Sequence, residues 1–351
     1  MASTAVAPDL DLALVSRFRY ACRPECGLCC YAEPRVLASE RARLLQIRPE
    51  TEFVRRGEFQ FLASHPDGGA CKLLTDRRCS AHTARPHPCR EFPLTIHVGD
   101  RLQATVVLSC PGVDLAGLQG APASSRSGPE GFDSELAAVR ARIEPSTARR
   151  MDVSRRRRQR IVRLLDNSGR WEEEEDVRRL LRDSIPLPAD EDFPALEPPS
   201  EDDGMDRLPL FFDGRAGPVA LSAGLGGWEL HELSPNGGFV RSLGVVPPPE
   251  EPPPLTSDAS ELLVGYLRYW LERDAFFGAL HYDMLEGADG TVSEWAAEEL
   301  RSIGAVTLAR AELRAKIARG EVDRLTPVDV ANGIRASDQD LLDRESWGER
   351  L

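Results

Sequence analysis

Eight cysteines carry the chemistry that this sequence offers, and all of them lie between Cys22 and Cys110. A chain gathers reactive thiols in this way when they form disulfides or bind metal. The first residues do not form an export signal, because Asp9 and Asp11 interrupt the region where its apolar core would lie. We therefore expect reduced thiols in the cytoplasm, which favours metal binding over a disulfide-stapled fold or a redox-active dithiol. The candidate metal ligands are Cys22, Cys26, Cys29, Cys30, Cys71, Cys79, Cys89 and Cys110.

Spacing divides these cysteines into a tight group and a scattered group. Cys26 and Cys29 form a Cys-x2-Cys step, a turn that brings two sulfurs to one ion, and Gly27 allows the chain to bend there. Cys30 directly follows Cys29, so both can serve one compact site only where the backbone is irregular. Otherwise one of the two cysteines lies next to the ligands without binding the metal, or it binds a second metal. The later cysteines come singly, separated by seven, nine and twenty residues.

The scattered spacing bears on the identity of the metal centre. A closed zinc site usually contains two Cys-x2-Cys pairs, and that double pattern is missing here. Ligands contributed singly from distant loops, together with the dipeptide Cys110-Pro111, suit an iron–sulfur cluster at least as well. The predicted cofactor is an iron–sulfur cluster, for example of the 4Fe-4S type, or else a zinc or iron ion. Arginines near the cysteines either donate hydrogen bonds to sulfur or are surface residues; Arg85 and Arg90 are the strongest functional candidates.

Two histidines lie between cysteines and offer nitrogen ligands. His82 and His87 would give the site mixed cysteine and histidine coordination. A single histidine in such a loop is more often a hydrogen-bonding or exposed residue. The cysteines therefore remain the predicted ligand set.

Three motifs together resemble a known family. They are Cys22-Arg-Pro-Glu-Cys-Gly-Leu-Cys-Cys30, Gly69-Ala-Cys71-Lys-Leu-Leu-Thr-Asp-Arg-Arg-Cys79-Ser and Arg85-Pro-His-Pro-Cys89-Arg-Glu-Phe-Pro93. Through them, residues 18–115 resemble the YkgJ-type cysteine-cluster family, which is described as chelating zinc or iron. The resemblance implies that all eight cysteines belong to the metal site, Cys110 being the trailing one. The chain departs from the family in one extra residue after Cys22 and in His82, where an aromatic residue is usual.

Three functions agree with such a site. The first is a metal- or cluster-binding protein whose second half offers a surface to a protein partner or substrate. The second is a protein-modifying enzyme, because the cysteine-rich region is also similar, more loosely, to that of a flagellin lysine methylase family with an iron–sulfur cluster. The third is metal delivery or storage, which needs exchangeable metal. The sequence lacks a phosphate-binding glycine loop, a Gly-x-Ser-x-Gly motif and a His-Glu-x-x-His motif, so it indicates no catalytic residue.

The expected fold class is α+β, in three segments. Residues 1–118 should form a small, irregular, cysteine-rich metal-binding domain, residues 119–206 a linker with a charged helical region, and residues 207–351 a β-meander with helices. Because the apolar core of the first segment is modest, metal binding should contribute much of its stability. Its pattern predicts a helix over 39–48, capped by Ser39, and strands over 94–97 and 104–108. The helix residues expected to face inward are Leu44, Leu45 and Ile47.

The later segments alternate between loop, helix and strand patterns. Residues 117–131 are rich in Gly, Ala, Ser and Pro and predict a linker, after which a helical region should begin at Ser134. Residues 186–206 have the composition of a connector, and residues 247–254 that of a stiff spacer. The remaining predicted elements are meander strands over 208–212, 219–222, 228–233 and 239–243, and helices over 257–285 and 292–319.

The charge and hydropathy of the chain indicate which classes of binding partner are expected. The net charge of −13 argues against nucleic acid as the main partner, although the stretch Arg149–Arg163 contains eight arginines. We interpret this stretch as a solvated helix neutralised by the acidic residues 172–176. No apolar run approaches the length of a membrane span, so no membrane partner is expected. The large apolar residues within 257–285 suit a buried helix or a homodimer contact. The inward residues expected on the arginine-rich helix are Ile161, Val162, Leu164 and Leu165.

Overall fold

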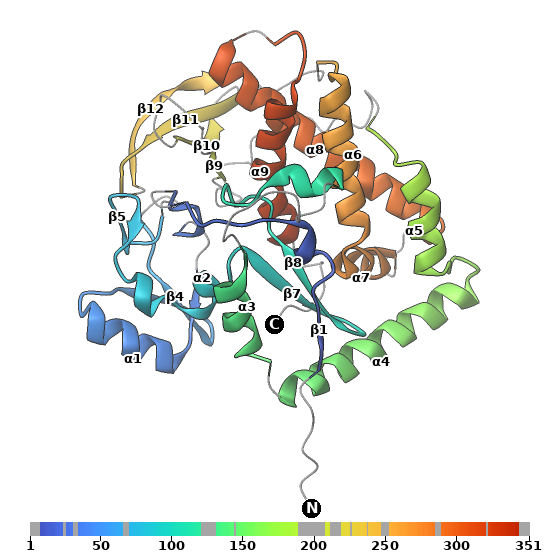
Figure 1. Ribbon diagram of the computed structural model, residues 1–351, viewed down its shortest axis with the longest axis horizontal. Helices are drawn as coiled ribbons and strands as arrows, with labels where there is room; N and C mark the ends of the chain where they lie inside the picture. The colour runs from blue at the N-terminus through green and yellow to red at the C-terminus, as the bar shows by residue number, and fades with distance from the viewer. Residues whose placement is uncertain are drawn as a thin grey trace, which may run out of the picture.

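Helices and several small sheets make up the structure, a computed structural model (Figure 1). This composition confirms the expected α+β class. No helix in the described part of the chain combines the length and the apolar character needed to cross a bilayer. The structure describes residues 8–23, 26–30, 34–65, 70–120, 131–143, 145–188, 208–210, 219–224, 227–236, 238–246, 253–284, 289–320 and 322–343.

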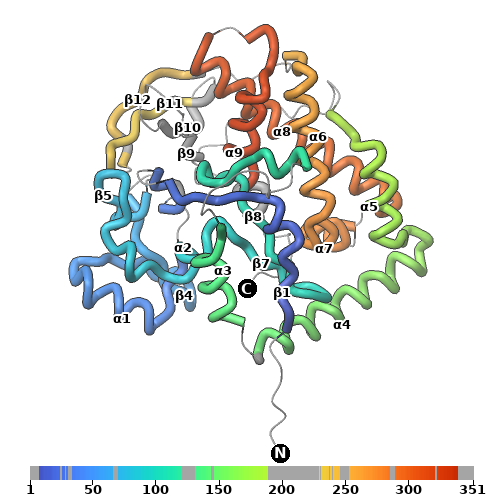
Figure 2. The backbone as a smooth tube through the Cα atoms, in the orientation of Figure 1, coloured from blue at the N-terminus to red at the C-terminus, as the bar shows by residue number. Residues whose placement is uncertain are grey.

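A three-stranded sheet lies at the centre of the molecule (Figure 2). Its middle strand β8 (Leu102–Val106) pairs in parallel with β1 (Leu10–Asp11) and antiparallel with β7 (Leu94–Val98). All five residues of β8 are buried. The two strands predicted in this region are confirmed as β7 and β8, although β8 begins at Leu102 rather than Ala104.

Four helices from the last part of the chain pack together: α6 (Ser257–Leu271), α7 (Asp274–Asp283), α8 (Val292–Arg319) and α9 (Pro327–Asp343) (Figure 1). Tyr269 of α6 donates a hydrogen bond to the Val106 carbonyl of the central sheet at 2.9 Å. The prediction for α8 is confirmed in full. Thr291 and Glu294 exchange hydrogen bonds at its start, in the reciprocal arrangement of a capping box. α8 and α9 approach closely at Gly333, where a Cβ would lie 2.3 Å from the Thr307 carbonyl oxygen. Glycine is required at this crossing.

The helix predicted over 257–285 is in fact two helices, α6 and α7. The chain bends at Glu272 and Arg273, where the Arg273 side chain is fully buried. The large apolar side chains of α6 and α7 are also buried in the core of their own chain. This helix pair therefore gives no support to a homodimer contact, which stays a prediction. α9 was not predicted at all.

Three helices form the charged region: α3 (Asp133–Arg140), α4 (Pro145–Asn167) and α5 (Glu174–Asp183). They confirm the helical region expected after the linker. On the arginine-rich α4, Ile161 and Leu165 are buried as predicted and Val162 is partly buried, whereas Leu164 is exposed, so its assignment was wrong. Arg158 pairs with Glu174 of α5 at 2.6 Å, which confirms that the acidic helix start neutralises part of α4.

The cysteine-rich region contains short elements. A three-stranded sheet has the order β2 (Arg35–Val36), β4 (Phe59–Leu62), β3 (Phe53–Arg56), and β5 (Leu74–Thr75) pairs with β6 (Arg78–Cys79). Helix α1 (Ala38–Ile47) begins after Leu37, so Ser39 is not its cap, contrary to expectation. Leu44 is fully buried and Leu45 partly buried, but Ile47 is 46% exposed and does not face the core as predicted. Helix α2 (His87–Glu91) completes the region.

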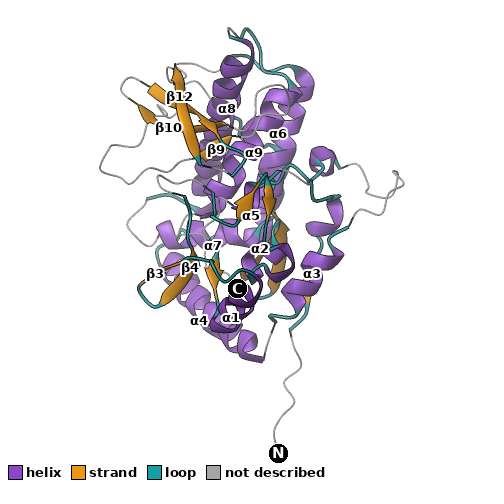
Figure 3. Cartoon of the chain, turned by 90° about the vertical axis from the view of Figure 1, so that its left-hand side faces the viewer, coloured by secondary structure: helices purple, strands orange, loops and turns teal. Residues whose placement is uncertain are grey.

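The four remaining strands confirm the predicted β-meander. β9 (Leu208–Leu210), β10 (Val219–Gly224), β11 (Gly227–Leu233) and β12 (Phe239–Val246) pair antiparallel in sequential order. The meander lies beside α8 and α9 (Figure 3). The predicted linker is wrong at its first residues, because Gly117 and Gln119 belong to the 3-10 helix η5 (Leu115–Gln119). Its residues 121–130, the connector residues 189–206 and the spacer residues 247–252 lie outside the described residues.

Two hydrophobic cores stabilise these elements. The larger core draws on all three expected segments, with Leu102, Leu165 and Trp270 among its fully buried members. The smaller core lies within residues 30–84 and includes Cys30, Leu44 and Cys71. The three domain boundaries themselves stay a prediction.

Candidate metal centre

Five thiols from separate short elements lie close together, and we call them the inner group: Cys29, Cys30, Cys71, Cys79 and Cys89. The Cys30 thiol shares hydrogen bonds with the sulfurs of Cys29 and Cys79. Cys89 lies within electrostatic reach of Cys29, Cys71 and Cys79. The inner group therefore combines cysteines from both the tight and the scattered parts of the sequence.

An irregular backbone places Cys29 and Cys30 in the same group. Gly27 adopts a left-handed conformation with φ of 67°, and the Cys30 amide donates to the Gly27 carbonyl at 3.0 Å, so the chain turns into the short 3-10 helix η2 (Leu28–Cys30). The Cys71 amide then donates to the Cys30 carbonyl at 2.6 Å. The backbone at Cys29 and Cys30 is therefore irregular, which is the condition under which adjacent cysteines can serve one site.

A tight hairpin brings Cys79 to the group. Asp76 and Arg77 have φ values of 49° and 60°, as in the two-residue turns that match the twist of a hairpin, and they connect β5 to β6. The tip of the hairpin is fixed by the turn between β11 and β12. There the Asp76 amide donates to Asn236 Oδ1 at 3.0 Å, and the Arg77 amide donates to the Pro235 carbonyl at 2.8 Å. The meander thus supports a loop that carries a candidate ligand.

Hydrogen bonding and burial divide the inner thiols by acidity. Hydrogen bonds from Cys30 lower the pKa of Cys29, and they lower the pKa of Cys79 to about 7 although burial opposes the shift. The same hydrogen bonds raise the pKa of Cys30. Burial raises the pKa of Cys71 to about 11 and that of Cys89 well above its usual range. The thiols of Cys29 and Cys79 are therefore more acidic than those of their neighbours in the inner group.

Arg85 acts on more than one of these thiols. Its charge lowers the pKa of both Cys29 and Cys79, which agrees with the functional role expected for it. Arg90 lies elsewhere, because it pairs with Glu40 at 3.2 Å. His87 also faces Glu40, with its Nδ1 3.2 Å from the carboxylate, and His82 is exposed.

The other three cysteines form an outer group of Cys22, Cys26 and Cys110. Burial, with smaller contributions from the charges of Cys26, Cys29 and Cys22, raises the pKa of Cys110 to about 12. Burial and the charges of Cys110 and Cys22 likewise raise the pKa of the Tyr20 hydroxyl. Cys29 thus lies within electrostatic reach of both groups.

The sulfurs are grouped but do not point at one position. Among the described residues, no three Cys, His, Asp or Glu side chains have the arrangement that holds a metal ion, and all eight cysteines are free thiols. The donor chemistry nevertheless fits zinc and iron, since thiolates are preferred ligands of both zinc ions and iron–sulfur clusters. Binding requires the thiols to lose their protons and to exchange their mutual hydrogen bonds for metal bonds.

Comparison with known proteins agrees with this donor set. Residues 21–111 match the CxxCxxCC family model. The description of that family is "Putative zinc- or iron-chelating domain". The match spans all eight cysteines, so the resemblance noted in the sequence is confirmed. No curated protein and no solved structure matches the chain.

The C-terminal helix α9 holds the loop that contains Cys110, a contact that the sequence did not predict. Arg335 donates from Nη1 to the Cys110 carbonyl at 2.8 Å and from Nη2 to the Val113 carbonyl at 3.3 Å. Asp338, one helical turn later, accepts from the Leu108 amide at 2.7 Å. These partners are more than 220 residues apart, so no local pattern could have indicated the contact.

A buried ion pair joins the same helix to the central sheet. Arg273 and Asp338 are both fully buried and interact in a bidentate pair of 2.9 and 3.1 Å. Arg273 also donates to the Val106 carbonyl at 3.0 Å, and the Tyr266 hydroxyl donates to Asp338 at 3.1 Å. Strand β8, which leads into the Cys110 loop, is therefore attached to α6, α7 and α9.

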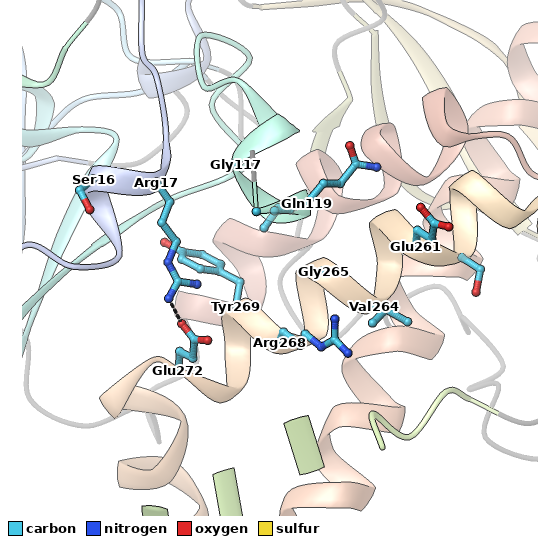
Figure 4. A pocket seen from close by; sticks show the side chains of 13 residues that line it. Ser16, Arg17, Gly117, Gln119, Glu261, Val264, Gly265, Arg268, Tyr269 and Glu272 are labelled. Carbon is cyan, nitrogen blue, oxygen red and sulfur yellow. Dashed lines mark ion pairs between the residues drawn. The ribbon is translucent and has the colours of Figure 1, made fainter. Parts of the chain in front are cut away.

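A groove of about 910 Å³ runs along α6, between η1 (Val15–Arg17) and η5 (Figure 4). Arg17 and Glu272 form an ion pair at one end, and Glu261 lies towards the other. η5 approaches α6 so closely that a Cβ on Gly265 would lie 2.4 Å from the Leu118 carbonyl oxygen. None of the described residues that line this groove is a cysteine or histidine, so it is separate from the thiol groups.

Glu40 anchors α1 to helix α2, which carries Cys89, and its ionisation should affect stability. Burial raises its pKa, but hydrogen bonds from His87 and Leu37 outweigh burial and lower the pKa to about 2. The resulting stabilisation is present above the unfolded pKa of about 4.3 and should be lost as the pH falls through about 2. In urea denaturation, Glu40→Gln should lower the free energy of unfolding by about 2 kcal/mol at pH 6 and leave it almost unchanged near pH 2.

The control for this prediction is Glu50→Gln, because Glu50 has an exposed side chain in a surface ion pair. The effect of Glu50→Gln on the free energy of unfolding should stay small at every pH. A Glu40→Gln effect that is constant between pH 2 and pH 6 would contradict the assigned ionisation.

Proposed function

We propose that the CxxCxxCC domain binds an iron–sulfur cluster through the inner group. The observation that supports this most directly is the gathering of five thiols from segments far apart in sequence, three of which lie within electrostatic reach of Arg85. Ligands collected singly in this way suit a cluster, which is larger than a single ion and reaches several loops. The bound cluster would supply a redox-active or structural inorganic centre.

Charge supports the same proposal. Four thiolates around an oxidised four-iron cluster leave a net charge of about −2, which is costly to bury without compensation. Arg85 lies beside Cys29 and Cys79, and Arg48 also lowers the pKa of Cys79. Nearby guanidinium groups would stabilise the thiolate form and influence the reduction potential of the centre.

The rest of the chain supports the centre in this proposal. The β11–β12 turn holds the Cys79 hairpin, and α9 holds the Cys110 loop. The free thiols agree with a cytoplasmic location, which we propose together with a protein partner or substrate. A cluster-dependent enzyme and a metal delivery protein remain alternatives at the level of the sequence, and no catalytic residue is assigned.

Anaerobic purification followed by elemental analysis tests the cofactor. We expect a brown protein that contains iron and inorganic sulfide in roughly equal amounts. A colourless protein with stoichiometric zinc would overturn the cluster in favour of a zinc centre on the same cysteines. A folded protein that holds neither metal, even after anaerobic reconstitution with iron and sulfide, would overturn both forms of the proposal.

A further inference from the structure

A groove of about 480 Å³ lies on the surface of the CxxCxxCC domain, between α1 and the β2–β4–β3 sheet. These elements lie together in the region of α1 and β4 in Figure 1. Three arginines line the groove from three different elements: Arg35 from β2, Arg41 from α1 and Arg55 from β3. The groove therefore concentrates positive charge at one point of a chain whose net charge is −13.

Aromatic and backbone contacts hold the guanidinium groups in place. The Arg35 guanidinium carbon lies 3.7 Å from the centre of the Phe59 ring, and that of Arg41 lies 5.1 Å from the Phe53 ring. Arg55 donates from Nε to the Gly57 carbonyl at 3.0 Å. A guanidinium stacked on an aromatic ring, or bonded through Nε alone, keeps other N–H groups available for a ligand.

These three charges are not neutralised by the part of the protein that the structure describes. Other arginines have acidic partners there; Arg158, for example, pairs with both Asp100 and Glu174. No carboxylate of the described residues forms an ion pair with Arg35, Arg41 or Arg55. Glu58 is the acidic residue that lines the groove. Three arginines against this one carboxylate leave the groove with net positive charge, which favours an anionic ligand.

The start of α1 adds to this preference. Leu37 and Ala38 lie in the lining, where the first amide groups of a helix carry partial positive charge. The carboxylate of Glu40 accepts from the Leu37 amide, and it is also bound by His87 and Arg90. The exposed side chains of Phe59 and Leu37 offer apolar contact beside the charges.

We propose that this groove binds a phosphate monoester. A monoester carries up to two charges and three acceptor oxygens, which match several guanidinium forks better than a single carboxylate does. The volume lies within the range of small-molecule sites, and the apolar lining would contact the organic part of the ligand. The phosphate would come from a small metabolite or from a phosphorylated protein side chain, two sources that share this chemistry. The proposal does not depend on the metal centre.

Isothermal titration calorimetry on the full chain tests the proposal with four probes: AMP, adenosine, a short phosphoserine peptide and the same peptide without phosphate. We expect heat of binding from AMP, from the phosphoserine peptide or from both, and none from the two unphosphorylated probes. Binding of AMP alone identifies the small-molecule source, and binding of the peptide alone the protein source. The absence of binding by both phosphorylated probes at low salt overturns the proposal.

Single substitutions show whether binding occurs in this groove. Arg35→Gln, Arg41→Gln and Arg55→Gln should each weaken the affinity by about tenfold, because each removes a charged hydrogen-bond donor. Arg35→Lys, which keeps the charge but loses the planar fork, should weaken it by about threefold. The matched control is Arg149→Gln on α4, an exposed arginine outside the groove. Equal losses in Arg149→Gln and Arg35→Gln would show non-specific attraction and overturn the site.

Discussion

Replacement of Asp338 by alanine should lower the free energy of unfolding by about 3–5 kcal/mol. The reason is that the Arg273 guanidinium would remain fully buried without its carboxylate partner. The Leu108 amide and the Tyr266 hydroxyl would also lose their acceptor. Urea denaturation followed by circular dichroism measures this loss, and Asp338→Asn should cost less because it keeps an acceptor oxygen.

Two further variants make this prediction specific. Glu52→Ala breaks an exposed ion pair with Lys72 at 2.7 Å and should change stability by less than about 1 kcal/mol. The double variant Arg273→Met with Asp338→Leu removes both charges and should recover much of the loss, because no unpaired charge stays in the core. If Asp338→Ala were as stable as Glu52→Ala, the prediction that loss of the Arg273–Asp338 ion pair destabilises the protein would be wrong.

Cys89→Ser should abolish stoichiometric metal binding. Cys89 is the inner thiol that lies near Cys29, Cys71 and Cys79 together, and a serine hydroxyl does not ionise to become a ligand at neutral pH. The loss of affinity should exceed about 100-fold, since the removal of a supporting residue outside the ligand shell alone costs up to about that much. Metal analysis after dialysis against a weak chelator measures the effect.

Hydrogen exchange should locate the consequence of this substitution. The smaller core within residues 30–84 contains Cys30 and Cys71, so its amides should exchange faster in Cys89→Ser. The helices α6 to α9, which belong to the larger core, should keep their protection. Cys22→Ser is the control, because Cys22 is exposed and belongs to the outer group, and it should retain most of the metal. Full metal content in Cys89→Ser would mean that the ligand assignment is wrong.

Local signals explain which elements were predictable from the sequence. Thr291 and Glu294 mark the start of α8 with a capping box, and the helix was predicted correctly. The sequence did not predict the break between α6 and α7, because the hydrophobic pattern continues past Arg273. The Arg273 side chain pairs with Asp338, which lies 65 residues away in sequence. The sequence did not predict α9, because its buried face includes Asp338 and Gly333. These residues are not large and apolar, so they weaken the periodic pattern by which a helix is predicted.

The candidate site was predictable in its chemistry but not in its arrangement. The types and order of the cysteines indicated the thiol donors and the family. Sequence spacing did not indicate that Cys30 would hydrogen-bond to Cys79, because that pair meets through a hairpin fixed by Asn236. It also did not indicate that Arg90 would face Glu40 while Arg85 faced the thiols, since both lie within a few residues of Cys89. Such differences depend on tertiary contacts.

The contact between Arg335 and the Cys110 carbonyl has a consequence for biogenesis. The two residues are 225 positions apart, and Arg335 is synthesised second. At typical elongation rates of roughly 5–20 residues per second, the ribosome needs roughly 10–45 s to extend the chain from one to the other. During that interval every cysteine has been synthesised, but the helix that steadies the Cys110 loop has not. Insertion of the proposed inorganic centre should therefore finish after translation, and a nascent chain stalled before α9 should incorporate it poorly.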